Sequence, residues 1–218
     1  MMSKTSTHPG ETTYPEKPAN HDYPINELIK QRWSPRLFEE GRTVEPEKLM
    51  SLLEAARWAP SCFNEQPWYY LVFDQRDPAA FERARQCLME GNAWAREAPL
   101  LLLSVAKENF SHNGAPNRHA QYDTGAATGY MVLQAVELGL MAHQMAGYDA
   151  ERARSEFQIP EGYTPMAMIA IGYPFKADLS QLDDKTRTRE LGLRSRRATR
   201  DLGFLGVWGK SLEAENAK

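Results

Sequence analysis

The amino-acid sequence predicts a layered α/β sandwich built as a single domain. Helical segments alternate with short apolar strands throughout the chain, no internal repeat interrupts them, and 218 residues with 42% hydrophobic content can bury a sizeable core. The longest apolar run, within residues 100–106, has the length of a strand and is far shorter than the roughly 18 residues of a membrane span. We therefore expect no membrane partner.

Composition narrows the expected setting of the protein. The net charge of −3 gives no general reason to expect nucleic acid as a partner. Cys62 and Cys87 are too few for a disulfide framework, and the sequence shows no close-spaced Cys and His cluster, so no metal site is expected. The first twenty residues lack the apolar centre of a signal peptide. A reducing, cytoplasmic location is the default expectation.

The two ends of the chain are expected to differ from its centre. Residues 1–23 have almost nothing to bury and are expected to form a flexible tail, which leaves residues 24–218 as the single domain. Residues 175–218 have few core-forming positions before Leu202. We expect this C-terminal extension to pack along a surface, either of its own chain or of a partner.

Periodicity and capping residues predict the elements between these ends. Pro46 suits the first turn of a helix, Asp149 suits an N-cap, and Gly139 is expected to end the longest helix. Residues 68–73 are aromatic and apolar, as a buried strand requires. The sequence predicts helices at 25–29, 46–58, 78–89, near 94, 120–138 and 149–157, and extended segments at 68–74, 100–106, 140–145 and 166–173.

A polar loop joins the predicted helix ending near residue 58 to the first strand. It reads Pro60-Ser61-Cys62-Phe63-Asn64-Glu65-Gln66-Pro67, in which two prolines oppose regular structure and small polar side chains lie close together. Loops that rigid elements hold at both ends commonly contact ligands, because their hydrogen-bonding groups stay free. The alternative is a plain helix-to-strand connection with a capping serine.

Two arginine clusters suggest a site for an anion. Arg32, Ser34 and Arg36 supply two permanent positive charges and a hydroxyl group within five residues, which suits a phosphate group. Arg196 and Arg197, near the other end of the chain, could converge on the same anion. The alternative for both clusters is solvation on the surface. The chain contains no GxGxxG pattern, no P-loop and no serine nucleophile elbow.

Five segments together resemble one family, the FMN-dependent nitroreductases in the broad sense. The resemblance spans residues 25–209, and its motifs occur in the family's order. Residues 32–38 look like the family's opening Arg-x-Ser-x-Arg-x-Phe motif, and residues 59–68 carry the most specific match. The other matching segments are Gly139-Leu140 through Gly147-Tyr148-Asp149, Ile171-Gly172-Tyr173-Pro174, and Arg196-Arg197 followed by Trp208-Gly209.

The resemblance implies an α+β fold and a particular assembly. The fold would be a three-layer α/β/α sandwich with a mixed central sheet. Two chains would form a domain-exchanged homodimer in which the C-terminal extension wraps the partner subunit. Two FMN sites would lie at the subunit interface, and each would use residues of both chains.

The resemblance also implies roles for individual residues. Arg32, Trp33 and Ser34 would hold the phosphate and ribityl side of FMN, Arg36 would approach the N1 and O2 edge of the flavin, and Arg196 and Arg197 would complete the phosphate clamp. From the other subunit, Pro60, Ser61, Cys62, Asn64 and Gln66 would line the flavin. Gln144, Met145, Ala146 and Gly147 would face the ring, with the backbone N–H groups of the last two near N5 and O4. The resemblance leaves open whether Asn92 or Trp94 approaches the pyrimidine edge.

The implied activity is NAD(P)H-dependent reduction of nitroaromatics, quinones or related acceptors. NADH or NADPH would transfer hydride to flavin N5 and leave, and the acceptor would then take the same place. No side chain need act as an obligatory acid or base, so no catalytic residue is expected apart from the flavin. Two positions depart from the family pattern: Cys62 stands where serine is more often expected, and Ala146 where some relatives carry glutamate.

Other functions remain open at the level of the sequence. Within the same fold, the protein could be a specialised flavin enzyme, such as a reductive dehalogenase or a flavin-fragmenting enzyme. It could also be a flavin-binding module without turnover. Nucleic-acid binding by the arginine-rich residues 185–200 is disfavoured, because nearby acidic residues offset the charge and no aromatic side chains are interleaved.

Overall fold

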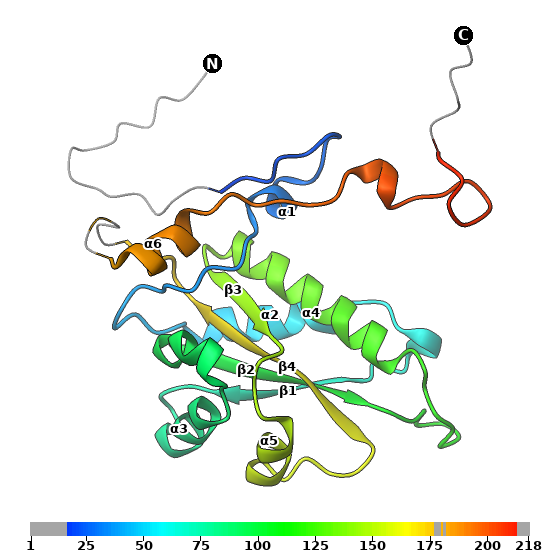
Figure 1. The fold of residues 1–218 in the computed structure, drawn as a ribbon. Coiled ribbons are helices and arrows are strands. Elements are labelled where there is room, and N and C mark those ends of the chain that lie inside the picture. The colour runs from blue at the N-terminus through cyan, green and yellow to red at the C-terminus, as the bar shows by residue number, and fades with distance from the viewer. Residues whose placement is uncertain (1–16, 177–179, 181, 213–218) are drawn as a thin grey trace.

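A computed structural model describes residues 17–176, 180 and 182–212 of the chain (Figure 1). The element bounds are α1 (Glu27–Gln31), α2 (Pro46–Arg57), η1 (Cys62–Asn64), β1 (Trp68–Phe73), α3 (Pro78–Gln86), η2 (Glu90–Glu97), β2 (Leu100–Lys107), α4 (Ala120–Glu137), β3 (Met141–Met145), α5 (Ala150–Glu156), β4 (Tyr163–Gly172), α6 (Asp184–Leu191) and η4 (Thr199–Asp201), where η marks a 3₁₀ helix. The predicted order of helices and strands is confirmed through β4. Asp149 caps α5 as predicted, accepting a hydrogen bond from the backbone N–H of Arg152.

The strands form one sheet in the order β1-β2-β4-β3. All three pairings are antiparallel, so the prediction of a mixed sheet is wrong for the part of the chain that the structure describes. β2 lies at the centre, and its first seven residues are buried on both faces, which explains why its sequence is continuously apolar rather than alternating. β3 lies at one edge of the sheet.

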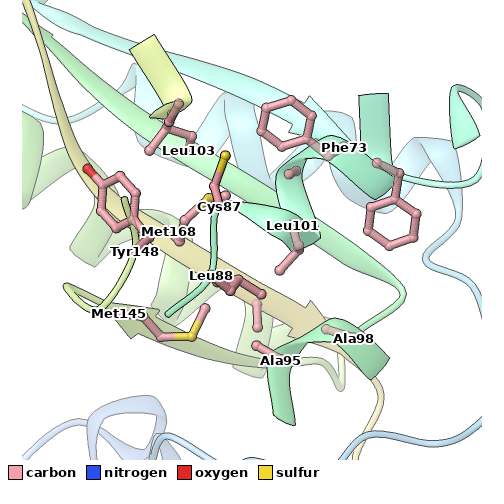
Figure 2. Close-up of a cluster of buried hydrophobic side chains, with 14 of the residues drawn as sticks. Phe73, Cys87, Leu88, Ala95, Ala98, Leu101, Leu103, Met145, Tyr148 and Met168 are labelled. Carbon is pink, nitrogen blue, oxygen red and sulfur yellow. The ribbon is translucent and has the colours of Figure 1, made fainter. Parts of the chain in front are cut away.

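Two layers of helices cover the two faces of the sheet (Figure 1). α2 and α4 pack on one face, where Leu102 and Ile169 point into a core with Leu52 and Met131. α3, η2 and α5 cover the other face. Figure 2 shows this second core, in which Leu101, Leu103, Met145, Tyr148 and Met168 gather around Cys87 and Leu88. Alternate residues of each strand face opposite cores, as strand geometry requires.

β4 begins three residues earlier than predicted, at Tyr163 rather than residue 166. Pro165 therefore lies within the strand, at a register shift between Ser104 and Val105 of β2. A proline is tolerated at a bulge or where one side of its strand is unpaired. Both conditions hold here, because β3 pairs with β4 only from Met168 onward.

The chain adds a helix where none was predicted. Asp183 caps α6 by accepting a hydrogen bond from the backbone N–H of Thr186 at 3.0 Å. From α6 the C-terminal arm, residues 192–212, runs past α1 (Figure 1). Leu193 and Trp208 in this arm are 97% and 91% exposed, and the ring that Trp208 contacts, Phe204 at 4.8 Å between centroids, belongs to the same arm.

The predicted flexible tail, residues 1–23, lies mostly outside the described residues. Its last seven residues, 17–23, are described and are tied to the body: the backbone N–H of Ala19 donates to the Lys30 carbonyl at 2.8 Å. Among the described helices, none has the length and apolar composition that crossing a membrane would require.

Candidate functional site

The opening arginine motif lies across the edge of the sheet. α1 ends at Gln31, and the following residues run in an extended path until Phe38 forms an isolated bridge with Pro174 beyond the end of β4. Pro35 lies over β3, where its carbonyl oxygen accepts a hydrogen bond from Nδ1 of His143 at 2.8 Å. The sequence therefore places Arg32, Ser34 and Arg36 in a fixed stretch of chain rather than in a free loop.

These residues line a cavity of about 540 Å³ together with the start of the C-terminal arm. Arg32 donates to the Ser34 hydroxyl group at 3.3 Å, and Arg196 donates to the Ser195 carbonyl at 2.7 Å. Among the described residues, neither guanidinium contacts a carboxylate. The cavity is lined by Lys17, Arg32, Trp33, Ser34, Arg36, Thr188, Arg189, Gly192, Leu193, Arg194, Ser195 and Arg196. It therefore presents an excess of positive charge.

Burial and like charge act together on Arg32. Its pKa lies below the ordinary value because burial disfavours the charged form, and Arg194 and Arg196 nearby add repulsion. Guanidinium groups stay charged nonetheless, so the cluster retains its repulsion. An anion bound between these side chains would relieve that repulsion.

Two residues that the sequence did not identify fix the wall of this cavity. Glu190 on α6 is fully buried, and its carboxylate accepts a hydrogen bond from the backbone N–H of Arg36 at 3.0 Å. Lys17 donates to the Glu190 carbonyl at 2.7 Å, and its ammonium lies 4.2 Å from the Trp33 ring centroid. No local signal links residues 17 and 190, but the N-cap at Asp183 could have revealed α6.

The polar loop at residues 60–66 has an unusual backbone. Phe63, Asn64 and Gln66 have φ values of 52°, 56° and 51°, in the left-handed region that non-glycine residues seldom adopt. The Ser61 hydroxyl accepts a hydrogen bond from the Gln66 backbone N–H at 2.9 Å, and Cys62 donates its backbone N–H to the Asp123 carboxylate, also at 2.9 Å. The loop predicted to contact a ligand is thus a shaped turn held by hydrogen bonds from its own backbone.

Glu65 joins this loop to the turn between β2 and α4. Its carboxylate accepts hydrogen bonds from the Ser111 backbone N–H at 2.8 Å and from Lys107 at 3.2 Å. Hydrogen bonds from Ser111 are the main reason that the pKa of Glu65 lies below its usual value. The same contact brings the rings of Phe63 and Phe110 to 5.9 Å in an edge-to-face arrangement.

The segment after β3 forms a turn, in which the Tyr148 backbone N–H donates to the Ala146 carbonyl at 3.0 Å. Gln144 and Ala146 are exposed, whereas Met145 is buried in the core. The Gly147 carbonyl accepts hydrogen bonds from the Asn92 side chain at 3.0 Å and from the Met89 backbone N–H at 3.1 Å. Among the described residues, the backbone N–H groups of Ala146 and Gly147 have no hydrogen-bond partner. Both donors are available to a ligand.

Gly147 has a structural reason to be glycine. A Cβ atom there would lie 2.6 Å from Nδ2 of Asn92, the atom that holds the turn. The other candidate of this region, Trp94, packs against His143 in a tilted arrangement with ring centroids 4.6 Å apart. Its indole Nε1 is buried and has no partner among the described residues.

The structure brings some predicted site residues together and keeps others apart. Trp33 lines the 540 Å³ cavity with Arg32, Ser34, Arg36 and Arg196, but Arg197 does not, and lines only an adjoining cavity. Residues 60–66 lie far from both. Within the described residues, no cluster of three or more metal-ligating side chains is found.

Sheet geometry fixes the separation between the arginine motif and the polar loop. Pro35 of the arginine motif bonds to His143, which pairs with Ala170 of β4, whereas residues 60–66 precede Trp68, which lies level with Thr164 at the start of β4. The six residue steps from Thr164 to Ala170 extend about 20 Å at about 3.3 Å per residue, and β1 and β3 lie at opposite edges of the sheet. Within one chain, the two predicted halves of the site lie at opposite ends of the sheet.

Comparison with known proteins gives this arrangement a context. A solved structure described as an oxidoreductase containing FMN superposes with a TM-score of 0.80 at 35% identity, covering 88% of this chain and 96% of that one. An FMN-dependent nitroreductase from Clostridium difficile R20291 is 28% identical, with a TM-score of 0.58, covering 72% of this chain and 94% of its own. The sheet and helices described above are thus a known fold.

Comparison of amino-acid sequences finds relatives of the same kind. A putative NADH dehydrogenase/NAD(P)H nitroreductase from Methanothermobacter thermautotrophicus is 30% identical over 154 residues, which are 69% of this chain and 77% of that protein. Residues 29–173 match the family described as the nitroreductase family. This match covers well over half of the chain, from α1 to the end of the sheet. The chain belongs to the nitroreductase family.

Proposed function

We propose that this protein is a homodimeric, FMN-dependent NAD(P)H oxidoreductase that reduces nitroaromatics, quinones or related acceptors. The observation that carries the proposal is the cavity at the sheet edge, in which arginines from both ends of the chain meet without a carboxylate partner for Arg32 or Arg196 among the described residues. Relatives whose names include FMN or NAD(P)H nitroreductase support it.

The donors in the cavity fit the phosphate group of FMN. Arg32 and Arg196 offer charge-assisted hydrogen bonds, and the Ser34 hydroxyl, already oriented by Arg32, adds a neutral donor. Glu190 is used by the backbone N–H of Arg36, so it fixes the chain rather than competing as an anion inside the cavity. A phosphate dianion would supply the missing negative charge.

The strand next to this cavity has a suitable length for the rest of the cofactor. β3 runs from Met141 to Met145, about 16 Å at 3.3 Å per residue, and ends at the turn carrying the free N–H groups of Ala146 and Gly147. With its phosphate at Arg32, the cofactor would extend along this edge strand. Its ring would then lie at the turn, where the two donors suit N5 and O4.

Arg36 lines the same cavity as Arg32, and we assign it to the pyrimidine side of the ring. Its guanidinium lines the cavity and has no carboxylate partner among the described residues, while its backbone is fixed by Glu190. Reduction of a bound flavin places negative charge near N1 and O2, which a fixed guanidinium stabilises. Bound FMN would accept hydride from NAD(P)H and deliver it to the acceptor. The protein would then need only to bind the flavin, orient the two substrates and stabilise the reduced flavin.

The separation of the two halves supports a dimer. Residues 60–66 and the arginine motif of the same chain are separated by about 20 Å along the strands and lie toward opposite edges of the sheet, so one chain does not place both beside the same ring. A second chain could present its own residues 60–66 to the ring. The exposed C-terminal arm, with Leu193 and Trp208 uncovered, suits the role of a segment that packs on a partner.

A spectroscopic experiment tests the proposal directly. The protein is purified, loaded with FMN, and titrated without oxygen with NADH and, separately, NADPH. Flavin absorption that bleaches on reduction and returns on addition of a quinone supports the oxidoreductase. Bound flavin that neither nucleotide reduces indicates a flavin-binding module without turnover. Protein that binds no FMN contradicts the whole proposal.

A further inference from the structure

A short segment before α1 ties together two helices beside the 540 Å³ cavity, which we call the phosphate cavity. We call this segment, residues 17–19, the N-terminal clasp. The backbone N–H of Ala19 donates to the Lys30 carbonyl near the end of α1 at 2.8 Å. The Lys17 side chain donates to the Glu190 carbonyl in the last turn of α6 at 2.7 Å. The N-terminal clasp therefore connects the end of α1 to the end of α6.

Arg194 links the N-terminal clasp to the phosphate cavity, which it lines. Its guanidinium donates to the carbonyls of Lys17 and Lys30, both at 2.8 Å. Both acceptors are uncharged, so Arg194 keeps its positive charge beside Arg32 and Arg196, which it repels. The two carbonyl oxygens hold the guanidinium in place against this repulsion. Without the Lys17 carbonyl, Arg194 would keep only one of these two acceptors.

Lys17 also stabilises the helix that fixes Arg36. The last carbonyl groups of a helix lack intrahelical partners and carry partial negative charge, so an ammonium group is favourable there. Lys17 supplies that ammonium at the end of α6, where the Glu190 carboxylate accepts a hydrogen bond from the Arg36 backbone N–H at 3.0 Å. The same ammonium lies 4.2 Å from the Trp33 ring centroid. One side chain thus connects the N-terminal clasp, α6 and the arginine motif.

Lys17 and a bound phosphate group would stabilise each other. The pKa of Lys17 lies below its ordinary value, because burial disfavours the charged form and Arg194 and Arg36 repel it, against the attraction of Glu190. A phosphate dianion in the cavity that Lys17 lines would favour the charged form. Because coupling between two binding events is reciprocal, a closed clasp would favour the phosphate group in return.

We propose that the N-terminal clasp holds the phosphate cavity in its binding shape and so sets how long the protein retains FMN, with Lys17 as the positioning residue. The inference rests on the proposed function, which places the phosphate group of FMN in this cavity. The match to the nitroreductase family begins at residue 29, so residues 17–19 lie outside it. Retention of the cofactor thus depends on a segment that the family match does not include.

Release of FMN tests this proposal. Protein loaded with FMN is diluted, the fluorescence of released flavin gives the dissociation rate, and equilibrium titrations give the affinities for FMN and riboflavin. Lys17→Ala should release FMN about tenfold faster than the unaltered protein, the scale of one hydrogen bond from a charged group. Riboflavin lacks the phosphate group, so its affinity should stay the same.

Lys30 provides a matched control for the loss of one positive charge. Its side chain pairs with Glu27 at 3.4 Å and does not line the phosphate cavity. Lys30→Ala keeps the carbonyl group that accepts from Ala19 and Arg194, so it should release FMN at the unaltered rate. If Lys17→Ala and Lys30→Ala speed release equally, the effect is general attraction and the proposal is wrong.

A second variant separates the N-terminal clasp from the charge of Lys17. Ala19→Pro removes the N–H group that donates to the Lys30 carbonyl and changes no charge. It should speed FMN release about fivefold, the scale of one uncharged hydrogen bond. If Ala19→Pro releases FMN at the unaltered rate, Lys17 acts as an isolated charge and the clasp is overturned.

The outcomes distinguish this inference from the proposed function. If the unaltered protein binds FMN and Lys17→Ala retains it equally well, the inference fails and the proposed function stands. The same conclusion follows if Lys17→Ala loses affinity for FMN and riboflavin by one factor, because the clasp would then support the fold rather than the phosphate cavity. Unaltered protein that binds no FMN overturns the proposed function itself.

Discussion

Cys62 and Asp123 connect the polar loop to the long helix α4 through one hydrogen bond of 2.9 Å, from the backbone N–H of Cys62 to the Asp123 carboxylate. Asp123 is 5% exposed, so water cannot easily replace it. The contact explains why a loop of seven residues can hold a defined shape at the end of a helix. It also makes Asp123 a residue that positions the loop without belonging to it.

Replacing Asp123 should therefore disturb the loop. Asp123→Ala leaves the Cys62 N–H without an acceptor and should lower the free energy of unfolding by about 1–3 kcal/mol. Asp123→Asn keeps a carbonyl oxygen at this position and should restore most of the loss. Chemical denaturation measures the free energy of unfolding, and FMN titration measures whether the altered loop still supports cofactor binding. Loss of FMN affinity equal in both variants would show that charge, not the hydrogen bond, is what matters.

Removing an arginine from the phosphate cavity should affect FMN and riboflavin differently. Arg32→Ala should weaken FMN binding by roughly 10–100-fold, the scale of one or two charge-assisted hydrogen bonds. Riboflavin lacks the phosphate group, so its affinity should change little. Fluorescence titration with both flavins measures the contrast. A parallel loss for both would place the phosphate elsewhere.

His143 should make stability depend on pH. Burial lowers its pKa below the ordinary 6.5, and Arg36 and Arg32 add repulsion, against the opposing hydrogen bond to Pro35. The unfolded chain thus takes up a proton at a higher pH than the folded protein, so stability is lost as pH falls below about 6.5. His143→Gln should flatten this part of the curve. Urea unfolding between pH 5 and 8 of both proteins tests the sign.

Gly147 and Asn92 should behave as a coupled pair. Gly147→Ala pushes a Cβ into the Asn92 amide, and Asn92→Ala removes the same hydrogen bond to the Gly147 carbonyl. Each change should cost about 1 kcal/mol or more. Because both act on one contact, the double variant should cost less than the sum. Denaturation midpoints of the four proteins complete the cycle, and strict additivity would argue against a shared contact.

Sites built from two chains can be recognised by complementation. Arg36→Ala and Asn64→Ala are each expected to be impaired, in opposite halves of the proposed site. A mixed dimer holds one site with both changes and one intact site, so refolding an equal mixture should recover about a quarter of full activity. Sites contained within single chains would recover nothing. Separate refolding of each variant is the control.

The sequence predicted the order of elements well because their signals are local. Pro46, the aromatic run of β1 and the cap at Asp149 each act within a few residues. The sheet was predicted less well, since strand pairing depends on contacts far apart in sequence. The prediction of a mixed sheet came from family resemblance, whereas the pairings within this chain are all antiparallel.

The site residues likewise divide into those that the local sequence indicates and those that only the fold brings together. The composition of residues 32–36 predicts an anion site, and the structure brings Arg196 to the cavity that these residues line. Nothing in the local sequence could reveal that Glu190 fixes the backbone of Arg36, or that Lys17 lies on Trp33. Such contacts join the two ends of the chain, and only the folded structure brings them together.

The left-handed residues of the polar loop have a consequence for engineering. Phe63, Asn64 and Gln66 each hold a conformation that costs about 1–3 kcal/mol for a non-glycine residue and that glycine adopts freely. Glycine at these positions would relieve that strain in the folded state, while making the loop more flexible when unfolded and less constrained when folded. Selection for stability would thus favour substitutions in the loop whose shape the proposed chemistry needs. Stabilising substitutions are better sought away from residues 60–66 and from the arginine motif.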